Sequence, residues 1–568
     1  MDIFCTDMIK VKIITISVIT IYMLVAMHIY ISNMGGSGLR LPSNIIGWIT
    51  VFIVIFGSWC FLDRNSQLRF NHACLFFLAG LLLLFIPVFF PQNVPSKSGV
   101  IRVLALLGSI IFYFTLLQCH FKTKEKLFLL WVLLGAVLIE TIITLAQIFL
   151  FEDNNWMEFN VNFSRPYGIF QQVNVMASFA ATGLVVSLYL FLTKGGERVK
   201  SQTAYRSFNI SDVILLLSFL LLPMTIVLLQ SRIGYLGASL SCAAMLFIHY
   251  RRQRLWCWLS LIFICVGVLN GIILLLESHI TTISHSGSNT ERWLILTNTW
   301  EMIQDKLWLG WGYGSFEYSF HHFLADQTPS ISMPRITHPH NEFLFWWVEG
   351  GFIALLGMLA LFAGYLQLLF FAWCRKCLSL FILSLPIVLH TMTEYPLYQS
   401  VAHIITLLLL LSFIDSGTEA NSTRTSVIAN GFSCVVRFSS LCALYFLITG
   451  FKATLVLTDL ERGGFISFSS ARELYNPYIN FSRYQFDEQV HNLMIFNTEK
   501  DISLLTGYLI WAENYSKFHV DENVYLDMIK ITQFLNMHEK TSNLIHEASV
   551  LFNHSIEFTQ RLNQLKTS

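Results

Sequence analysis

The residues best suited to chemistry stand in the segment 337–342, where His338, His340, Asn341 and Glu342 directly precede a long apolar run. Histidine titrates near neutral pH, so its ring can accept or donate a proton under physiological conditions. A neighbouring carboxylate and amide can orient that ring or hydrogen-bond a polar substrate. At the polar end of a membrane helix, such a cluster is a candidate site for proton transfer and for binding of a charged substrate.

The same two histidines, separated by Pro339, could also ligate a metal ion. Zinc sites in proteins use three or four side-chain ligands. No third ligand stands at a suitable spacing, and the chain has no HExxH motif. The sequence therefore predicts neither a metal site nor a cofactor.

The elements that must position these residues are membrane helices. The 568 residues are 55% hydrophobic and 12% charged, with a mean hydropathy of +0.59, whereas ordinary soluble domains carry about 25% charged residues. The composition predicts an all-α, polytopic membrane protein. The net charge of +1 gives no reason to expect a nucleic-acid partner. No cysteine lies in 278–342 or 458–568, so those segments have no disulfide framework.

Hydropathy predicts about thirteen membrane spans, each near the length that crosses a bilayer. The first apolar run is long enough to span and lacks a small-residue cleavage site, so we interpret it as a span rather than a signal peptide. The predicted ranges are 13–32, 44–62, 73–90, 100–119, 127–151, 169–193, 211–230, 233–250, 257–277, 343–373, 378–395, 399–415 and 437–457.

Basic residues predict the orientation of the spans. Clusters such as 122–126 and 251–254 fall on alternate connections, whereas the opposite connections hold single basic residues. Because basic clusters remain on the cytoplasmic side, the N-terminus is predicted to be cytoplasmic and the C-terminus to lie outside. The isolated basic residues on the outer side are Arg40, Lys97, Arg102, Arg165 and Arg232.

Three arginines on the outer side could bind a substrate anion, since a guanidinium group binds phosphate in a bidentate manner. Arg165 precedes the sixth span, Arg232 lies in the tight turn before the eighth, and Arg292 lies on an amphipathic segment of the loop 278–342. Each has a structural alternative. Arg165 could snorkel to the headgroups, Arg232 could anchor a headgroup, and Arg292 could pair with Glu291.

Polar groups within or beside the spans add to this candidate site. Gln172 and Asn174 stand in the first turns of the sixth span, where amides need partners and could instead join helices. Glu394 and Tyr395 end a later span. Because His390 and Glu394 are four residues apart on one helix face, a structural His–Glu pair is the alternative to a substrate contact.

Two segments are predicted to lie outside the membrane. The loop 278–342 is longer than a plain connector and is predicted to be functional. The tail 458–568 is polar, and the stretches 504–515, 524–537 and 542–553 have helical apolar periodicity. We predict a transmembrane domain at 1–457 and a helical, tetratricopeptide-like domain at 458–568.

Five sequence blocks in order resemble one known family. The His-Pro-His-Asn-Glu-Phe-Leu segment and the Glu-Gly-Gly that follows it are similar to the signature of the O-antigen ligase and polymerase superfamily. The other blocks resemble its branch of PglL-type protein O-oligosaccharyltransferases, with Val173 where that branch commonly has Pro. These blocks begin at Arg165, Ser231, Arg292 and Glu394, so the resemblance covers about residues 160 to 400.

The resemblance implies a GT-C-like fold in the bacterial inner membrane, with the active site on the periplasmic side. It implies inverting, metal-independent transfer of a preassembled glycan from undecaprenyl diphosphate to Ser or Thr of periplasmic or pilin-like proteins. His340 would be the catalytic histidine, and Arg232 and Arg292 would hold the diphosphate. The residues implied to line the same pocket are Arg165, Gln172, Asn174, His338, Asn341, Glu342, Glu394 and Tyr395.

Two alternatives remain open from the sequence. An O-antigen ligase or polymerase would use the same donor with a lipopolysaccharide acceptor. A solute transporter would also use buried charged groups, but these more often lie near the bilayer midplane than at one face.

Overall fold

Helices form almost all the regular structure in the computed structural model, which describes residues 2–62, 68–90, 97–162, 164–200, 209–277, 286–328, 331–371, 375–414, 418–419 and 426–567. Two short strands, β1 (Arg69–Phe70) and β2 (Thr418–Glu419), form one antiparallel pair. The prediction of an all-α, polytopic membrane protein is confirmed. Within the predicted loop 278–342, residues 278–285 and 329–330 lie outside the described residues.

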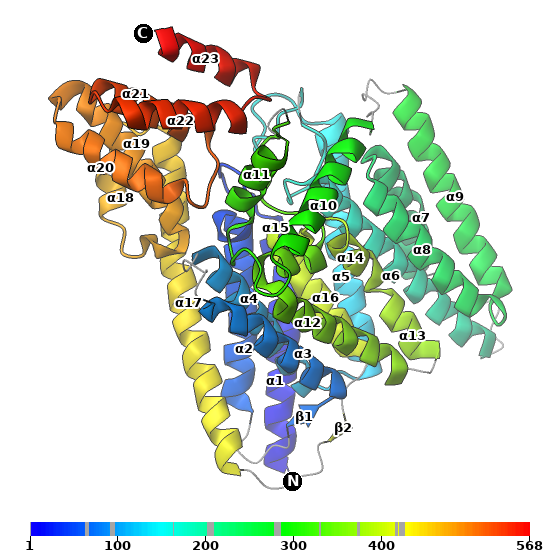
Figure 1. Ribbon diagram of the computed structural model, residues 1–568. Coiled ribbons are helices and arrows are strands. Elements are labelled where there is room, and N and C mark those ends of the chain that lie inside the picture. Colours follow the sequence, from blue (N-terminus) through cyan, green and yellow to red (C-terminus); the bar gives the residue numbers. More distant parts are fainter. Residues whose placement is uncertain are drawn as a thin grey trace. The chain divides into compact units, whose positions relative to one another are not determined.

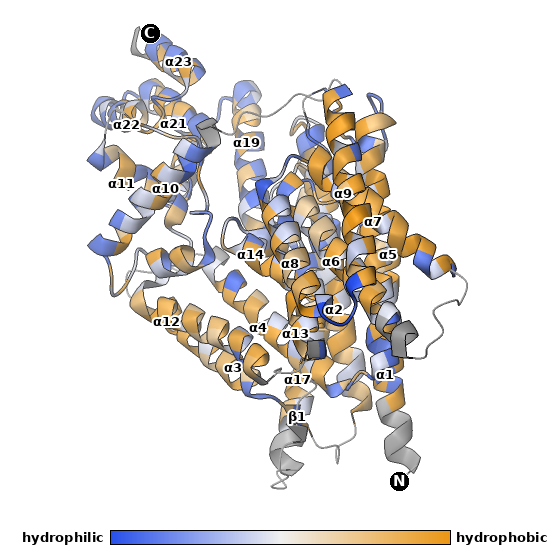
Figure 2. Ribbon diagram, turned by 90° about the vertical axis from the view of Figure 1, so that its right-hand side faces the viewer, coloured by the Kyte–Doolittle hydropathy of each residue, from blue (hydrophilic) through white to orange (hydrophobic). Residues whose placement is uncertain are grey.

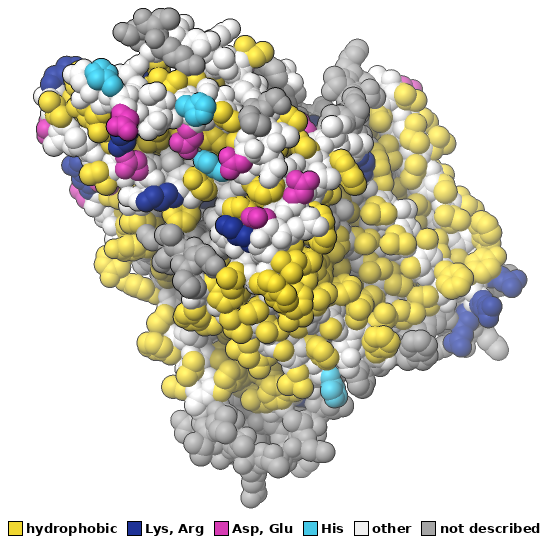
Figure 3. Space-filling view, viewed as in Figure 1, with side chains coloured by type: hydrophobic (Ala, Val, Ile, Leu, Met, Phe, Trp, Pro, Cys, Tyr) yellow, Lys and Arg dark blue, Asp and Glu magenta, His cyan; other side chains and the backbone are white. Residues whose placement is uncertain are grey.

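Eleven helices in the described ranges are long and apolar enough to cross a membrane. These helices differ in how much of their surface is buried inside the protein, as α6 and α9 show. The apolar stretch of α6 is 100% buried, whereas that of α9 is only 17% buried. Most residues of α7 and α9 are hydrophobic (Figure 2), and hydrophobic side chains cover the face of the molecule on which α9 lies (Figure 3). These helices are α1 (Asp2–Leu24), α2 (Pro42–Phe61), α3 (His72–Phe85) continued by the 3₁₀ helix η3 (Ile86–Phe89), α4 (Lys97–Gln118), α5 (Thr123–Phe149), α6 (Val173–Lys200), α7 (Ile210–Leu228), α8 (Arg232–Tyr250), α9 (Arg254–Glu277), α12 (Glu342–Phe371) and α17 (Ser426–Arg462).

Two of the predicted spans are shorter than hydropathy indicated. The range 378–395 contains two helices, α13 (Arg375–Ile382) and α14 (Leu385–Thr391), with Pro386 in the first turn of α14. The range 399–415 contains α16 (Val401–Ile414), whose 14 residues rise only about 21 Å and cannot span a hydrocarbon layer of about 30 Å. The short helix α15 (Pro396–Gln399) lies between α14 and α16.

The chain divides into two compact units. The first consists of Met1–Phe77, Gly108–Ser284 and Ala363–Leu455, and the second of Leu78–Leu107, His285–Phe362 and Val456–Ser568. Four long helices, α3, α4, α12 and α17, contribute residues to both units. The predicted boundary between residues 457 and 458 is untested and stays a prediction.

In the first unit, α6 packs against α5, α7, α8 and α14 (Figure 1). Glycines allow this close packing. A Cβ atom added at Gly183 would lie 2.4 Å from Val137 of α5, and one added at Gly234 would lie 2.8 Å from Ala177. Because small residues let helix backbones approach closely, the start of α8 lies directly against the first turns of α6.

In the second unit, α12 is kinked at Gly351, which has φ 69° and ψ −163°. The kink frees backbone groups that bind the preceding loop. The Phe352 amide donates to the Trp308 carbonyl over 3.2 Å, and the Gly312 amide donates to the Glu349 carbonyl over 2.8 Å. The loop between α10 (Ser286–Asp305) and α11 (Phe316–Gln327) is therefore held against the first half of α12.

The tail in the second unit consists of paired helices. The three stretches with predicted helical periodicity form α20 (Ile502–Tyr515), α21 (Glu522–Phe534) and α22 (His538–Leu551). Asp501 and Asp521 cap α20 and α21 by accepting backbone N–H groups. The other tail helices are α18 (Ser469–Arg472), α19 (Phe481–Glu499) and α23 (Ile556–Thr567), and the short 3₁₀ helices of the chain are η1 (Ala26–His28), η2 (Gly38–Arg40), η3 (Ile86–Phe89) and η4 (Pro477–Asn480).

Replacement of Gly351 by Ala should destabilise the protein strongly. Its backbone has positive φ, and an added Cβ atom would lie 2.2 Å from the Trp308 carbonyl oxygen. We expect a loss of about 2–3 kcal/mol, measured as a lower unfolding temperature in detergent. In the matched variant Gly507→Ala, the added Cβ meets open space on α20, so stability should rise by about 0.5–1 kcal/mol. Equal unfolding temperatures for the two variants would contradict this account of the kink.

Candidate functional site

His338 and His340 form a tight turn at the start of α12. His340 has φ 59°, the left-handed region, which costs a non-glycine residue about 1–2 kcal/mol. The turn is stabilised by the His340 amide, which donates to Nδ1 of His338 over 2.8 Å. Asn341 then caps α12, because its Oδ1 accepts the Leu344 amide over 3.1 Å. Strained residues of this kind are concentrated at functional sites.

The bond to Nδ1 determines the tautomer of His338. Because Nδ1 accepts a hydrogen bond, the neutral ring carries its proton on Nε2. That nitrogen lies 3.5 Å from Oε1 of Glu342, and Oε2 of the same carboxylate accepts Trp346 Nε1–H over 3.2 Å. His338 is 4% exposed and Glu342 is 7% exposed. The buried side chains of His338 and Glu342 therefore hold the turn in place. The turn thereby positions the imidazole ring of His340.

A buried ion pair, Arg102 with Glu349, stabilises the same end of α12. The Arg102 guanidinium lies 4.3 Å from the Phe345 ring centroid and 5.0 Å from that of Trp346, distances typical of cation–π contacts. Oε1 of Glu349 accepts the Phe316 amide over 3.1 Å, which places the carboxylate at the N-terminus of α11, where negative charge is favoured. From the sequence, Arg102 was an isolated basic residue on the outer side, and its pairing with Glu349 was not predicted.

A second cluster, in the first unit, is centred on Glu394. Its Oε1 accepts the Asn174 amide over 2.6 Å, and its Oε2 accepts the Gln172 amide over 3.4 Å. Nε2 of His390 lies 3.3 Å from Oε2, so the predicted His–Glu pair is present. Burial, together with the charge of Glu394, raises the pKa of Tyr395. Glu394 is 4% exposed, and these donors compensate for the loss of solvent.

The two arginines of the first unit lie at the α7–α8 turn. The Arg165 guanidinium donates to the carbonyls of Leu229 and Gln230, a favourable position for a cation because it is the C-terminal end of α7. Burial lowers the pKa of Arg165, although the charges of Tyr235 and Glu394 oppose this effect. The Arg165 side chain therefore binds backbone carbonyl groups of the protein. The alternative in which it extends to the lipid headgroups did not predict these bonds.

Arg232 is the first residue of α8, directly after its capping residue Ser231. The Ser231 hydroxyl donates to Oδ1 of Asn174 over 2.7 Å and accepts the Gly234 amide over 3.3 Å. The bond to Asn174 therefore connects the start of α8 to the Glu394 cluster. Ser231 belonged to one of the blocks noted in the sequence, but its role as a link between the two helices was not predicted.

The predicted site residues are thus divided between the units. Arg165, Gln172, Asn174, Arg232, Glu394 and Tyr395 belong to the first unit, and Arg292, His338, His340, Asn341 and Glu342 belong to the second. Arg292 lies half-buried on α10, and α10 contacts α12 through Trp300 and Trp347, whose ring centroids are 5.6 Å apart. The convergence of Arg232, Arg292 and His340 on one substrate stays a prediction.

The C-terminal helices hold the segment that leads into the His338–His340 turn. Oε1 and Oε2 of Glu317 on α11 accept Nε and Nη2 of Arg335 over 2.6 and 3.1 Å. The same carboxylate lies 3.1 Å from Nδ1 of His519 and accepts the Val520 amide over 2.9 Å. Arg335 stands three residues before His338, so the tail clamps this segment. We call Glu317, Arg335 and His519 the Glu317 clamp.

Two further contacts connect the tail to this region. The Ser332 hydroxyl lies 2.7 Å from Nδ1 of His554 and accepts the His554 amide over 2.7 Å. Nε2 of His322 on α11 lies 3.1 Å from Glu547 on α22. The sequence showed no sign of these contacts, because each joins residues more than 200 positions apart.

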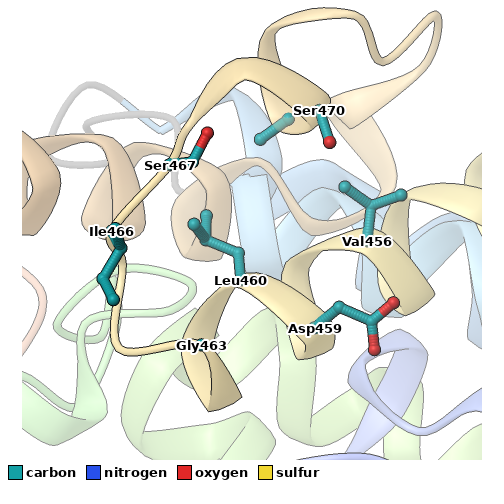
Figure 4. A pocket seen from close by; sticks show the side chains of 8 residues that line it. Val456, Asp459, Leu460, Gly463, Ile466, Ser467 and Ser470 are labelled. Carbon is teal, nitrogen blue, oxygen red and sulfur yellow. The ribbon is translucent and has the colours of Figure 1, made fainter.

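Two further observations concern possible metal sites and cavities in the described part of the chain. No group of three or more His, Cys, Asp or Glu side chains is placed to hold a metal ion there. A cavity of about 350 Å³ lies at the end of α17 (Figure 4) and contains none of the predicted site residues. Its lining consists of Val456, Asp459, Leu460, Gly463, Ile466, Ser467, Ser470 and Ala471.

Three family models match successive segments of the chain, and these segments contain the predicted site residues. The model described as protein glycosylation ligase matches residues 166–191, and that described as O-antigen ligase matches 217–359. The model described as virulence factor membrane-bound polymerase, C-terminal, matches 378–566. The chain is a PglL-type member of the O-antigen ligase superfamily. No curated protein matches it.

Membership of this superfamily indicates a multi-pass membrane enzyme of glycosyl transfer. It also implies, in general terms, a lipid-linked glycan donor and a protein or lipid acceptor. The O-antigen ligase match contains Arg232, Arg292 and the His338–His340 turn, and the other two matches contain Asn174 and Glu394. Both polar clusters therefore lie in the segments that the superfamily shares.

Replacement of Glu317 by Gln should loosen the clamp. Although burial opposes it, hydrogen bonds and charges from His519 and Arg335 lower the pKa of Glu317 from 4.5 to about 2. The carboxylate therefore contributes about 3 kcal/mol, fully present above pH ~4.5 and lost as the pH falls to about 2. We expect faster amide hydrogen exchange in α20 and α21 at neutral pH in the variant.

The matched control is Glu557→Gln. Glu557 pairs with Arg561, but the two side chains are 73% and 54% exposed, and such surface pairs contribute about 0.5 kcal/mol or less. Its exchange should equal that of the wild type. Unchanged exchange in Glu317→Gln would show that the clamp does not hold the tail.

Proposed function

We propose that the protein is an oligosaccharyltransferase that moves a preassembled glycan en bloc from undecaprenyl diphosphate to a Ser or Thr hydroxyl of an exported protein, pilin-like proteins included. The observation that carries this proposal is the His338–His340 turn. It presents an imidazole in a strained, hydrogen-bonded backbone, within the residues matched by the O-antigen ligase model. The protein acceptor is favoured by the match of residues 166–191 to a protein glycosylation ligase.

In the proposed step, the acceptor oxygen attacks the anomeric carbon and its proton passes to the His340 imidazole. The bond between that carbon and the diphosphate oxygen breaks on the opposite face, so the configuration inverts. The electron pair leaves with the lipid diphosphate, whose developing negative charge is offset by Arg232 and Arg292. The activated leaving group supplies the driving force, so the reaction needs no nucleotide and no metal ion.

The remaining residues would shape and hold this centre. His338 and Glu342 orient the turn through the bonds described above, and Asn341 caps the helix that carries it. Arg165, Gln172 and Asn174, together with Glu394 and Tyr395, would line the side of the donor pocket that carries Arg232. The basic clusters support a location of this centre on the periplasmic side of a bacterial inner membrane, with the N-terminus cytoplasmic and the C-terminus periplasmic.

A second candidate function is glycan polymerisation or ligation to a lipid acceptor. The match of residues 378–566 to the C-terminal part of a membrane-bound polymerase favours it. The chemistry at the donor would be the same, and only the acceptor hydroxyl would differ. Purified protein reconstituted with lipid-linked oligosaccharide, and offered both a pilin-like protein and a lipid A-core acceptor, distinguishes the two. The proposal requires glycan on Ser or Thr of the protein, located by mass spectrometry.

Replacement of His340 by Asn should reduce transfer by roughly 10²–10⁴-fold. Asn tolerates positive φ, so the turn should persist while the general base, which contributes roughly 10²–10⁴-fold, is removed. Glycoprotein formed per mole of membrane-inserted enzyme is the measurement. His546→Asn is the control, because His546 is exposed on α22, and it should retain wild-type activity. Activity within tenfold of wild type in His340→Asn would refute the assignment of His340.

A further inference from the structure

Two histidines of the first unit are fully buried and have no role in the proposed function. His390 at the end of α14 and His403 on α16 are each 0% exposed. The Ser178 hydroxyl of α6 connects them, lying 2.8 Å from Nδ1 of His390 and 3.1 Å from Nε2 of His403. Beyond His403, the Ser400 hydroxyl lies 3.0 Å from Nδ1. Together with Glu394 these four residues form a continuous hydrogen-bonded chain, which we call the Glu394 relay.

Counting protons gives this relay one direction when both rings are neutral. An ionised Glu394 accepts only, so His390 must donate from Nε2 and accept at Nδ1. Ser178 must then donate to His390, and since a hydroxyl has one proton, His403 must donate from Nε2 to Ser178. Ser400 completes the chain by donating to Nδ1 of His403. Every hydrogen bond of the relay therefore points toward Glu394.

The same geometry accepts one additional proton without breaking a bond. The Ser178 hydroxyl also lies 3.1 Å from the Val175 carbonyl oxygen. If His390 is protonated on Nδ1, Ser178 can turn its proton to Val175 and accept from both rings. A serine oxygen accepts two hydrogen bonds and donates one, so all of its capacity is then used. A buried polar group without a hydrogen bond destabilises the fold, and His390 keeps its hydrogen bonds in both protonation states.

The charged groups around His390 determine when its ring would bind a second proton, on Nδ1. Glu394 carries the negative charge on the same segment, and Asn174 connects it through Ser231 to the start of α8, which begins with Arg232. The Arg165 charge also acts on Glu394. His403 on α16 is the other titratable group of the relay, α6 contributes only neutral side chains to it, and Tyr395 and Tyr398 follow Glu394 on the segment leading to α16.

We propose that His390 takes up a proton when a diphosphate binds beside Arg232 and Arg165. This inference rests on the proposed function. A bound diphosphate adds negative charge beside a buried carboxylate, and protonating His390 turns the His390–Glu394 pair from a net charge of −1 to neutral. By linkage, a ligand whose binding takes up one proton gains about tenfold in affinity per unit fall in pH. The gain stops once His390 is protonated in the free protein as well.

The test is calorimetric titration of the full-length protein in detergent with farnesyl diphosphate, a soluble isoprenoid diphosphate, in buffers of different ionisation enthalpy. The slope of the observed enthalpy against buffer enthalpy gives the protons taken up. Wild type should take up more protons than His390→Gln, by as much as one. Gln can still donate to Glu394 but cannot titrate, so its affinity should also vary less with pH. Protons taken up by the ligand itself are the same for both proteins, so they cancel when the uptake of His390→Gln is subtracted from that of the wild type.

Further variants separate this role from a structural one. Ser178→Ala removes the acceptor for the second proton and should reduce the uptake, whereas Ser178→Thr restores the hydroxyl and should recover it. His249→Gln replaces another buried histidine of the same unit, bound to Ser379, and should retain wild-type uptake. Uptake in His390→Gln or Ser178→Ala equal to wild type would overturn the inference alone. If wild type fails to bind farnesyl diphosphate, the proposed diphosphate recognition fails with it.

Discussion

A carboxylate buried among apolar helices must be matched by hydrogen-bond donors, and Glu394 and Glu349 are two such carboxylates beside the candidate chemistry. In the first unit, Glu394 accepts two side-chain amides and contacts an imidazole. In the second, Glu349 pairs with Arg102 and accepts a backbone amide. Because an unmatched buried charge costs several kcal/mol, these donors hold helix ends that are distant in sequence. The segments that carry the candidate chemistry are the ones held in this way.

Backbone conformation adds a second constraint. His340, Gly351 and the glycines at 310 and 312 all have positive φ, so the chain reverses sharply on both sides of α12's first half. Only glycine fits at Gly351, where the backbone of Trp308 is in contact. The Glu-Gly-Gly segment at 349–351 and the glycine-rich segment near residue 310 therefore pack against each other through their backbones. Their joint role is to fix the helix that begins after His340.

The features that could be predicted from the sequence depend on local composition or on residues a few positions apart. Hydropathy predicted the membrane helices, and the spacing of His390 and Glu394 predicted their contact. Prediction failed where contacts join distant positions. Nothing near Arg102 indicates a partner 247 residues away, and Ser178 and His403 stand in apolar helices without neighbours that suggest a relay. The range 399–415 was predicted as one span, but Gln399 ends the short helix α15 and α16 begins only at Val401.

In the proposed reaction, the glycan leaves its lipid carrier by cleavage of the bond next to the diphosphate. The most direct measurement is the identity and amount of the lipid product when purified protein, in the presence of a metal chelator, acts on undecaprenyl-diphosphate-linked oligosaccharide with an acceptor. We expect one undecaprenyl diphosphate to be released for each glycan transferred. Intact donor carried across the membrane, or a lipid monophosphate as the first product, would contradict the proposed reaction.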